Sequence, residues 1–97
     1  MENKLTVAFD VDLTLITHDD RPKYDVVFVM SWFIGRGHDV IVWSSGGGGW
    51  AEMWVRRLGF EGCVRVVGKW SEPVDIAFDD MDIQSAGESI AKVVVRV

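Results

Sequence analysis

The chain has a single cysteine, fewer basic than acidic residues and no long apolar run. The lone cysteine, Cys63, excludes an internal disulfide, and with no second metal ligand near it we expect a core residue in a reducing compartment. No apolar stretch approaches the length of a membrane span, and the N-terminus lacks the charged and apolar regions of a signal peptide. These absences predict a soluble cytoplasmic protein without a membrane partner.

Basic residues are outnumbered, with 10 lysines and arginines against 15 aspartates and glutamates and a formal net charge of -5. This balance argues against broad binding of nucleic acid or of an anionic membrane by the whole surface. A nucleotide substrate is not excluded, because a bound metal would offset several of the acids. The two histidines, His18 and His38, have no ligand spacing, so a histidine-based metal site is not expected.

A chain of 97 residues with 48% hydrophobic content is large enough for one core, and no repeat or linker divides it. We therefore expect a single domain over residues 1–97. Short apolar strands alternate with crossover segments, which predicts an α/β fold: a three-layer, Rossmann-like domain with a mainly parallel sheet of about five strands and no cap domain. Strands are expected at 5–9, 40–43, 64–67, 74–78 and 90–97, helices at 24–34 and 50–58, and a short helix or irregular crossover at 81–89.

Two acids follow the first predicted strand at once. Asp10 and Asp12, with Thr14 two positions further on, form an Asp-x-Asp-x-Thr pattern. Adjacent carboxylates at the end of a buried strand repel each other and are costly to desolvate unless a cation or a hydrogen-bond network compensates. A divalent metal compensates both costs, so the pattern indicates metal-assisted phosphate chemistry.

Three further strand ends carry polar side chains of the same kind. Ser44 ends the second strand, with Ser45 as the alternative, Lys69 follows the third, and Asp79 and Asp80 end the fourth. Because ligands of an open parallel sheet bind outside the carboxyl ends of its strands, these side chains are expected to meet the first acid pair there. Neighbouring residues of a regular strand point to opposite sides, so Asp79 and Asp80 are not expected to contact a metal equivalently.

This order of residues resembles the haloacid dehalogenase superfamily of phosphatases and phosphotransferases, over residues 5–80. The resemblance implies a Mg²⁺-dependent phosphomonoester hydrolase that acts through an aspartyl phosphate on Asp10, with Asp12 as acid and base. It also implies the remaining roles: Ser44 or Ser45 and Lys69 as phosphate ligands, Thr14 as the residue that stabilises the adjoining loop, and Asp10, Asp80, the supporting Asp79 and the backbone carbonyl of Asp12 at the metal.

The intervals between the predicted elements have no room for a cap, so the site is expected to be open. An open site favours a substrate too large to be enclosed, such as a nucleic-acid end or a protein, while a nucleotide or small metabolite phosphate stays possible. The glycines at 46–49 fit either a flexible connection or a close approach of backbone N–H groups to phosphate. Trp43, Trp50 and Trp70 adjoin this edge, where core packing is favoured over stacking on a base.

Two non-enzymatic functions compete with the hydrolase. A response-regulator receiver also gathers acids, a hydroxyl and a lysine around Mg²⁺, but its phosphoacceptor follows an early acid pair and its lysine comes late. Here the Asp-x-Asp pattern comes first, and Lys69 precedes the acid pair. A regulatory domain that keeps Mg²⁺ only for structure would not need every charged residue of the pattern. The sequence does not indicate the oligomeric state.

Overall fold

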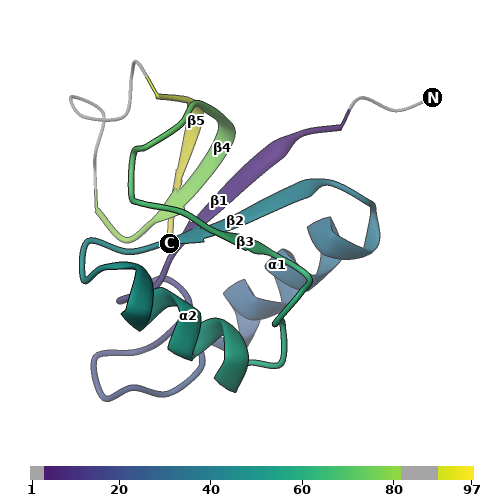
Figure 1. Ribbon diagram of the computed structural model, residues 1–97. Coiled ribbons are helices and arrows are strands. Elements are labelled where there is room, and N and C mark those ends of the chain that lie inside the picture. The colour runs from purple at the N-terminus through teal and green to yellow at the C-terminus, as the bar shows by residue number, and fades with distance from the viewer. Residues whose placement is uncertain (1–3, 82–89) are drawn as a thin grey trace.

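The computed structural model describes residues 4–81 and 90–97. Within them the element bounds agree with the predicted ones to about two residues, the usual uncertainty of helix and strand ends. The predicted short helix or crossover at 81–89 lies almost wholly outside the described residues. The elements in chain order are β1 (Thr6–Asp10), α1 (Tyr24–Gly35), β2 (Asp39–Trp43), α2 (Gly48–Arg57), β3 (Arg65–Val66), β4 (Val74–Asp79) and β5 (Ala91–Arg96) (Figure 1).

The five strands form one sheet in which every pair is parallel, in the order β3-β2-β1-β4-β5. The chain leaves β1 toward β2 and β3 on one side and then returns to place β4 and β5 on the other. The direction in which successive strands are added therefore reverses between β1 and β4. Parallel α/β sheets bind ligands at the carboxyl ends of such a pair of strands. The predicted α/β class and parallel sheet are confirmed.

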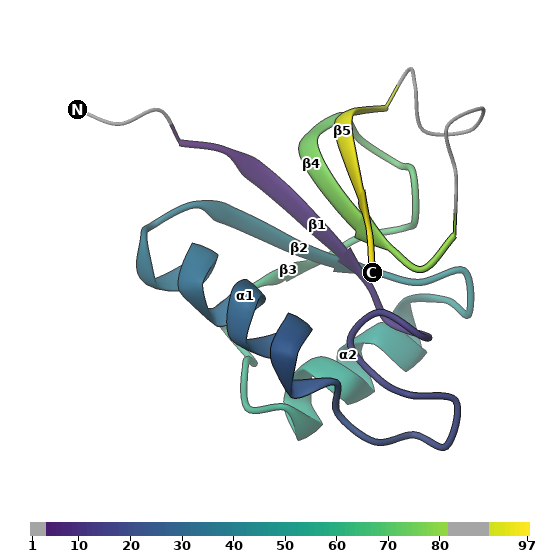
Figure 2. The same ribbon diagram turned by 180° about the vertical axis from the view of Figure 1, so that it is seen from behind.

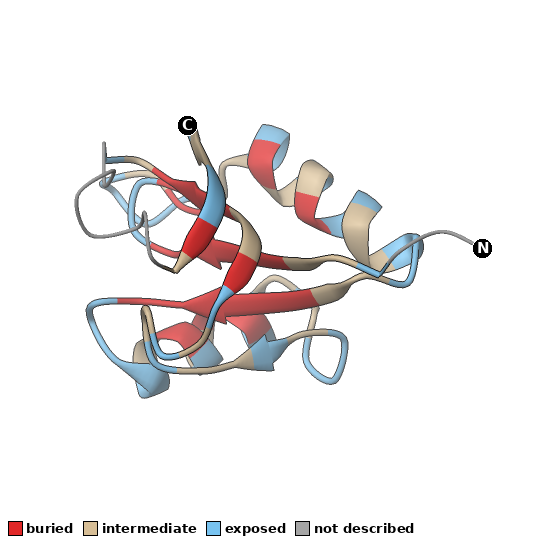
Figure 3. Cartoon of the chain, turned by 90° about the horizontal axis from the view of Figure 1, so that it is seen from above, coloured by how far each residue is buried: buried red, intermediate tan, exposed pale blue. Residues whose placement is uncertain are grey.

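Both helices cover the same face of the sheet (Figure 2). The crossovers β1–α1–β2 and β2–α2–β3 run in the same direction, and right-handed crossovers then put both helices on one side. On that side Val26 and Met30 of α1 and Trp54 of α2 share a buried cluster with Val7 and Phe9 of β1. Figure 3 shows the buried residues concentrated along the central strands and the facing sides of the helices.

The other face of the sheet has its own buried cluster, built on Ala8, Ile41 and Trp43. Val67 and Trp70, from the connection between β3 and β4, pack against it. Within residues 4–81 and 90–97, this face is covered by connecting segments rather than by a helix. The third layer expected of a Rossmann-like domain is therefore irregular in the part of the chain that is described.

Three phenylalanines fix α1 over β1 and β4. The rings of Phe9 and Phe78 stack with centroids 4.6 Å apart and planes 3° from parallel, and both meet the ring of Phe33 edge-on. Phe9 and Phe78 are also register partners in the parallel pair. Because side chains alternate along a strand, the residues that follow these two phenylalanines point away from the helices. Those residues are Asp10 and Asp79.

Cys63 is exposed, so the expectation that it packs in the core is wrong. It lies in the turn after α2, where its backbone N–H donates to the carbonyl of Phe60. The turn directs its short side chain outward although neighbouring residues are apolar. Separately, the described helices are all too short or too polar to cross a membrane.

We predict that Phe78→Ala lowers the free energy of unfolding by about 3–5 kcal/mol, because it removes a ring from the stack and leaves a cavity. Met81→Ala is the control, since Met81 is 61% exposed and its loss should change stability by less than about 0.5 kcal/mol. Urea denaturation followed by circular dichroism measures both values. Equal effects of the two substitutions would contradict the role of the stack.

Candidate functional site

Three carboxylates meet at the carboxyl ends of β1 and β4. One ligand oxygen from each of Asp10, Asp79 and Asp80 lies within 4.8 Å of the others. Asp10 and Asp79 are 4% and 1% exposed, and Asp80 is half-buried. Such a group of buried acids is stable only when a proton, a cationic side chain or a metal ion compensates its charge.

Asp79 and Asp80 each bring a carboxylate oxygen near Asp10, whereas alternation along a regular strand predicted that they would not be equivalent and the resemblance assigned direct ligation to Asp80. The strand β4 ends at Asp79, and the backbone bends at Asp80, so the alternation stops between them. The backbone N–H groups of Met81 and Val97 hold this bend by donating to the Asp79 carboxylate at 3.0 Å and to its carbonyl oxygen at 2.9 Å. Asp79 is thus available as a ligand in its own right.

Lys69 enters the acid cluster from the connection between β3 and β4. Its Nζ lies 2.8 Å from Oδ2 of Asp79 and 3.3 Å from Oδ1 of Asp10, and only 15% of the side chain is exposed. The next residue, Trp70, adopts a left-handed backbone with φ of 63° and packs its ring against Trp43, with centroids 5.1 Å apart. This contact confirms the packing role expected of Trp70, and it anchors the connection that directs Lys69 inward.

Burial raises the pKa of Asp10 from 3.8 to about 7, since the nearby Lys69 lowers it by less than desolvation and Asp79 raise it. Burial alone lowers the pKa of Lys69, but its hydrogen bond to Asp79 and the charge of Asp10 outweigh burial and raise it. Lys69 is therefore a permanent cation, and it faces more negative charge than it can neutralise. Near neutral pH the cluster takes up either a proton or another cation.

The carboxylate of Asp12 is exposed and lies apart from the cluster of Asp10, Asp79 and Asp80. Its Oδ1 accepts a hydrogen bond of 3.3 Å from Nε1 of Trp50, in the first turn of α2. This contact joins two segments 38 residues apart and holds Asp12 at the rim of the site. Sequence reasoning named Trp50 as a neighbour of the site but missed its partner.

The glycine run at 46–49 makes room for that tryptophan. A Cβ at Gly46 would lie 3.3 Å from Cδ1 of Trp50 and 3.3 Å from Oγ of Ser44, and Gly47 has φ of 101° before the first turn of α2. A side chain at Gly46 would crowd Ser44 and Trp50, and the left-handed backbone at Gly47 favours glycine there. The glycine run together with the tryptophan that follows it was therefore the sequence feature that could have indicated the contact of Trp50 with Asp12.

Ser44 directly follows β2 and is 5% exposed, whereas Ser45 is exposed. Oγ of Ser44 accepts the backbone N–H of Gly46 at 3.0 Å, and a hydroxyl in this arrangement still has its own hydrogen to donate. The helix α2 begins four residues later with no side-chain cap and no acid in its first turn. Its first N–H groups and the positive end of its dipole are thus open to an anion.

Thr14 is fully buried. The backbone N–H groups of Thr14, Leu15 and Ile16 converge on the carbonyl oxygen of Val11 at 2.9–3.2 Å, which closes a tight turn after β1. The turn also requires a left-handed backbone at Leu13, with φ of 62°. These contacts come from the backbone, and the buried Oγ1 of Thr14 has no hydrogen-bond partner among the described residues, so the stabilising role expected of its side chain stays a prediction.

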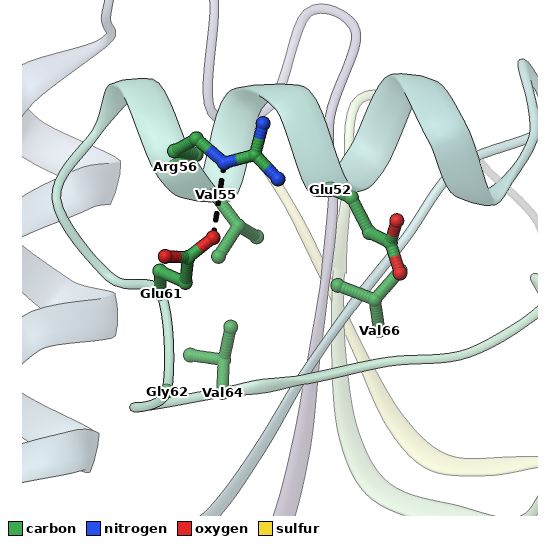
Figure 4. A pocket seen from close by; sticks show the side chains of 7 residues that line it. All are labelled: Glu52, Val55, Arg56, Glu61, Gly62, Val64 and Val66. Atoms are coloured by element: carbon green, nitrogen blue, oxygen red, sulfur yellow. Dashed lines mark hydrogen bonds and ion pairs between the residues drawn. The ribbon is translucent and has the colours of Figure 1, made fainter.

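The described surface includes a hollow beside the carboxylate cluster and another away from it. One of about 370 Å³ adjoins the carboxylate cluster, and its lining residues are Leu13, Thr17, His18, Lys23, Asp80 and Val97. The other, of about 290 Å³, lies between α2 and the segment before β3 and shares no residue with the cluster (Figure 4). The first hollow gives a ligand of the cluster room to extend past Asp80.

Comparisons with protein-family models, with curated proteins and with solved structures found no match to this chain. The function is therefore argued from the geometry and chemistry of the site alone.

We predict that the metal-free protein loses stability as pH rises from about 4 to about 7. The raised pKa of Asp10 means that the folded state holds a proton in this range that the unfolded chain has released, so rising pH favours unfolding. Asp10→Asn removes this dependence, and urea denaturation in a chelator should show the variant gaining stability over wild type as pH rises. Added Mg²⁺ should stabilise wild type more at about pH 8 than at about pH 5, because protons compete for the same oxygens.

Asp20→Asn is the control for this titration. Asp20 is exposed, and its φ of 61° suits asparagine as well as aspartate. This variant should keep the pH dependence of wild type. Parallel stability profiles of wild type and Asp10→Asn would contradict the assignment.

Proposed function

We propose that the chain is a Mg²⁺-dependent phosphomonoester hydrolase whose nucleophile is Asp10. The observation that carries the proposal is the meeting of Asp10, Asp79 and Asp80 with Lys69 at the point where the sheet order reverses. Carboxylates that supply ligands and a nucleophile, beside a lysine that binds an anion, are the residue types that phosphoryl transfer needs. These residues come from separate segments of the chain, so a local structural role such as capping or closing a turn does not explain why they meet.

The residues fit Mg²⁺ because every nearby ligand is a carboxylate oxygen, which this hard cation prefers. Asp10, Asp79 and Asp80 would hold the ion. When bound, Mg²⁺ would neutralise part of the negative charge shared by the carboxylates and a phosphate group. Lys69 contributes the remaining positive charge from the protein itself.

The proposed reaction has two displacements. The Asp10 carboxylate attacks phosphorus, a new O–P bond forms, and the bond from phosphorus to the ester oxygen breaks while Asp12 gives that oxygen a proton. Water then attacks the aspartyl phosphate, Asp12 takes a proton from it, and the bond between phosphorus and Asp10 breaks. Inorganic phosphate leaves, and both side chains return to their starting state.

The transferring phosphoryl group needs donors for its oxygens. The hydroxyl of Ser44, the first N–H groups of α2 and the ammonium of Lys69 approach the same edge of the sheet. Donors that are already in place stabilise developing charge without reorganisation, which is the main source of catalysis in phosphoryl transfer. Thr14 acts indirectly in this scheme, through the turn that carries Asp12.

The order of these residues along four strands supports the resemblance to a capless member of the haloacid dehalogenase superfamily. The hollow beside Asp80 gives the leaving group space, and Lys23 and His18 line it. An open rim with these side chains suits a nucleotide or the phosphorylated end of a nucleic acid. The net charge of -5 favours a short contact at the site over extended polynucleotide binding.

We predict that Asp10→Asn lowers Mg²⁺-dependent hydrolysis of p-nitrophenyl phosphate by at least about 1,000-fold, because the amide cannot attack phosphorus. Asp20→Asn should keep the wild-type rate. Acid-quenched reactions with labelled substrate should trap phosphate on wild type and not on Asp10→Asn. Equal rates for wild type and Asp10→Asn would disprove the nucleophile, and a wild type inactive on a panel of phosphate esters would favour a non-catalytic Mg²⁺-binding domain.

We further predict that Trp50→Phe impairs the acid role of Asp12, because it keeps a ring but removes the N–H that holds this carboxylate. The value of kcat/KM should fall about tenfold or more for alkyl phosphates, whose leaving oxygen needs a proton. For p-nitrophenyl phosphate, whose leaving group departs without one, it should fall less than about threefold.

Trp54→Phe is the matched control for this test. Trp54 lies one turn further along α2, and its Nε1 has no hydrogen-bond partner among the described residues. In Trp54→Phe, the ratio of kcat/KM for alkyl phosphates to kcat/KM for p-nitrophenyl phosphate should stay at its wild-type value. A uniform loss on both substrates in Trp50→Phe would assign Trp50 a structural role instead.

A further inference from the structure

The outer face of α1 is apolar and open. Tyr24, Phe28 and Trp32 are 74%, 73% and 48% exposed, and their spacing of four residues puts them in one row along the helix. The opposite face of the same helix, with Val26 and Met30, packs on the sheet. A helix that is apolar on nearly all sides normally has partners on all of them.

The exposed row is large for a protein of this size. The three side chains together expose the equivalent of about two complete aromatic side chains, or roughly 400 Å² of mainly apolar surface. Contiguous apolar patches of this extent on a folded domain mark interaction surfaces. The row shares no residue with the acid cluster or with the hollow beside it, although Lys23 of that hollow directly precedes Tyr24.

We propose that this face is the interface of a homodimer in which two copies of α1 pack antiparallel about a two-fold axis beside Phe28. A two-fold axis pairs a surface with itself, so the patch must complement its own copy. With Phe28 at the axis, Tyr24 meets the partner's Trp32 and Trp32 meets the partner's Tyr24. The row therefore pairs aromatic with aromatic along its whole length.

The geometry of the helix surface suits this contact. Rows of side chains four residues apart are the ridges that interdigitate in the commonest class of helix packing. Ser31 and Gly35 flank the row and are exposed, and a Cβ at Gly35 would meet no atom within 4 Å. These two small residues leave room for a second helix to approach.

The charges at the ends of α1 favour the antiparallel direction. Asp25 lies in the first turn, and Arg36 follows the last turn with its guanidinium 4.8 Å from the ring centroid of Trp32. An antiparallel pair brings each arginine toward Asp25 of the other helix, although Lys23 at the N-cap offsets part of that charge, and it opposes the two helix dipoles. A parallel pair would align the two helix dipoles and bring the two copies of Arg36 together.

The available area also matches a small dimer. Two copies of the row supply roughly 800 Å² of aromatic surface, about half of the 1,600 Å² in a standard interface. The exposed residues beside the row, among them Ser31, Gly35 and Arg36, would contribute to the rest. The contact is therefore expected to be weak and reversible, with a dissociation constant in the micromolar range or above.

Analytical ultracentrifugation of the full chain tests the interface. Wild type should sediment as a dimer that dissociates on dilution, and Phe28→Glu should raise the dissociation constant at least about 30-fold, as loss of a central aromatic contact does. Val93→Glu is the control, because Val93 is 53% exposed but lies on β5, away from the row. Circular dichroism checks that both variants are folded.

Charge exchange tests the direction of the helices. Tyr24→Lys and Trp32→Glu should each weaken the dimer, and the double variant should regain it in low salt, because position 24 then faces an opposite charge at position 32. A wild type that stays monomeric at every concentration, or a dimer that survives Phe28→Glu, would overturn the proposal. So would a dimer that Val93→Glu dissociates, which would put the contact on β5, or a double variant that regains no affinity.

Discussion

The stack of Phe9 on Phe78 is the contact on which the rest of the structure depends. It locks β1 and β4 in register and attaches both strands to α1 through Phe33. Because side chains alternate across a strand, the same register forces Asp10 and Asp79 together on the side away from the helices. A slip of one residue would exchange apolar and acidic side chains between the two faces. The register of β1 and β4 therefore sets both the packing of the core and the position of the acids.

The structure must also compensate the repulsion and desolvation of three neighbouring carboxylates. Asp10, Asp79 and Asp80 face one ammonium group, that of Lys69, so attraction to the lysine compensates only part of the charge. Burial and the uncompensated negative charge together raise the pKa of Asp10, so that in the absence of another cation the cluster retains a proton to about pH 7. A divalent cation and a phosphate group would complete the charge balance of the proposed site.

Most of the fold and the main acids of the site were predictable, because both follow from local patterns. Apolar runs ended by polar residues located the strands, and the carboxyl ends of parallel strands must share an edge. The misses arose where geometry departs from a regular pattern. The bend at Asp80 gives both neighbouring acids access to Asp10, a turn exposes Cys63, and both described helices fall on one face of the sheet. None of these follows from hydrophobic periodicity.

The sequence by itself determined the alternation of strands and helices, the presence of acids at strand ends and the approach of Lys69 to them, because each is encoded by neighbouring residues and by the rules of parallel sheets. Only the tertiary structure decided the long-range pairings. The hydrogen bond from Trp50 to Asp12 joins two loops that no periodicity connects, and the exposed row on α1 emerges only when its other face is seen to be buried. Such contacts depend on how elements meet in space, which side-chain packing sets and local sequence does not.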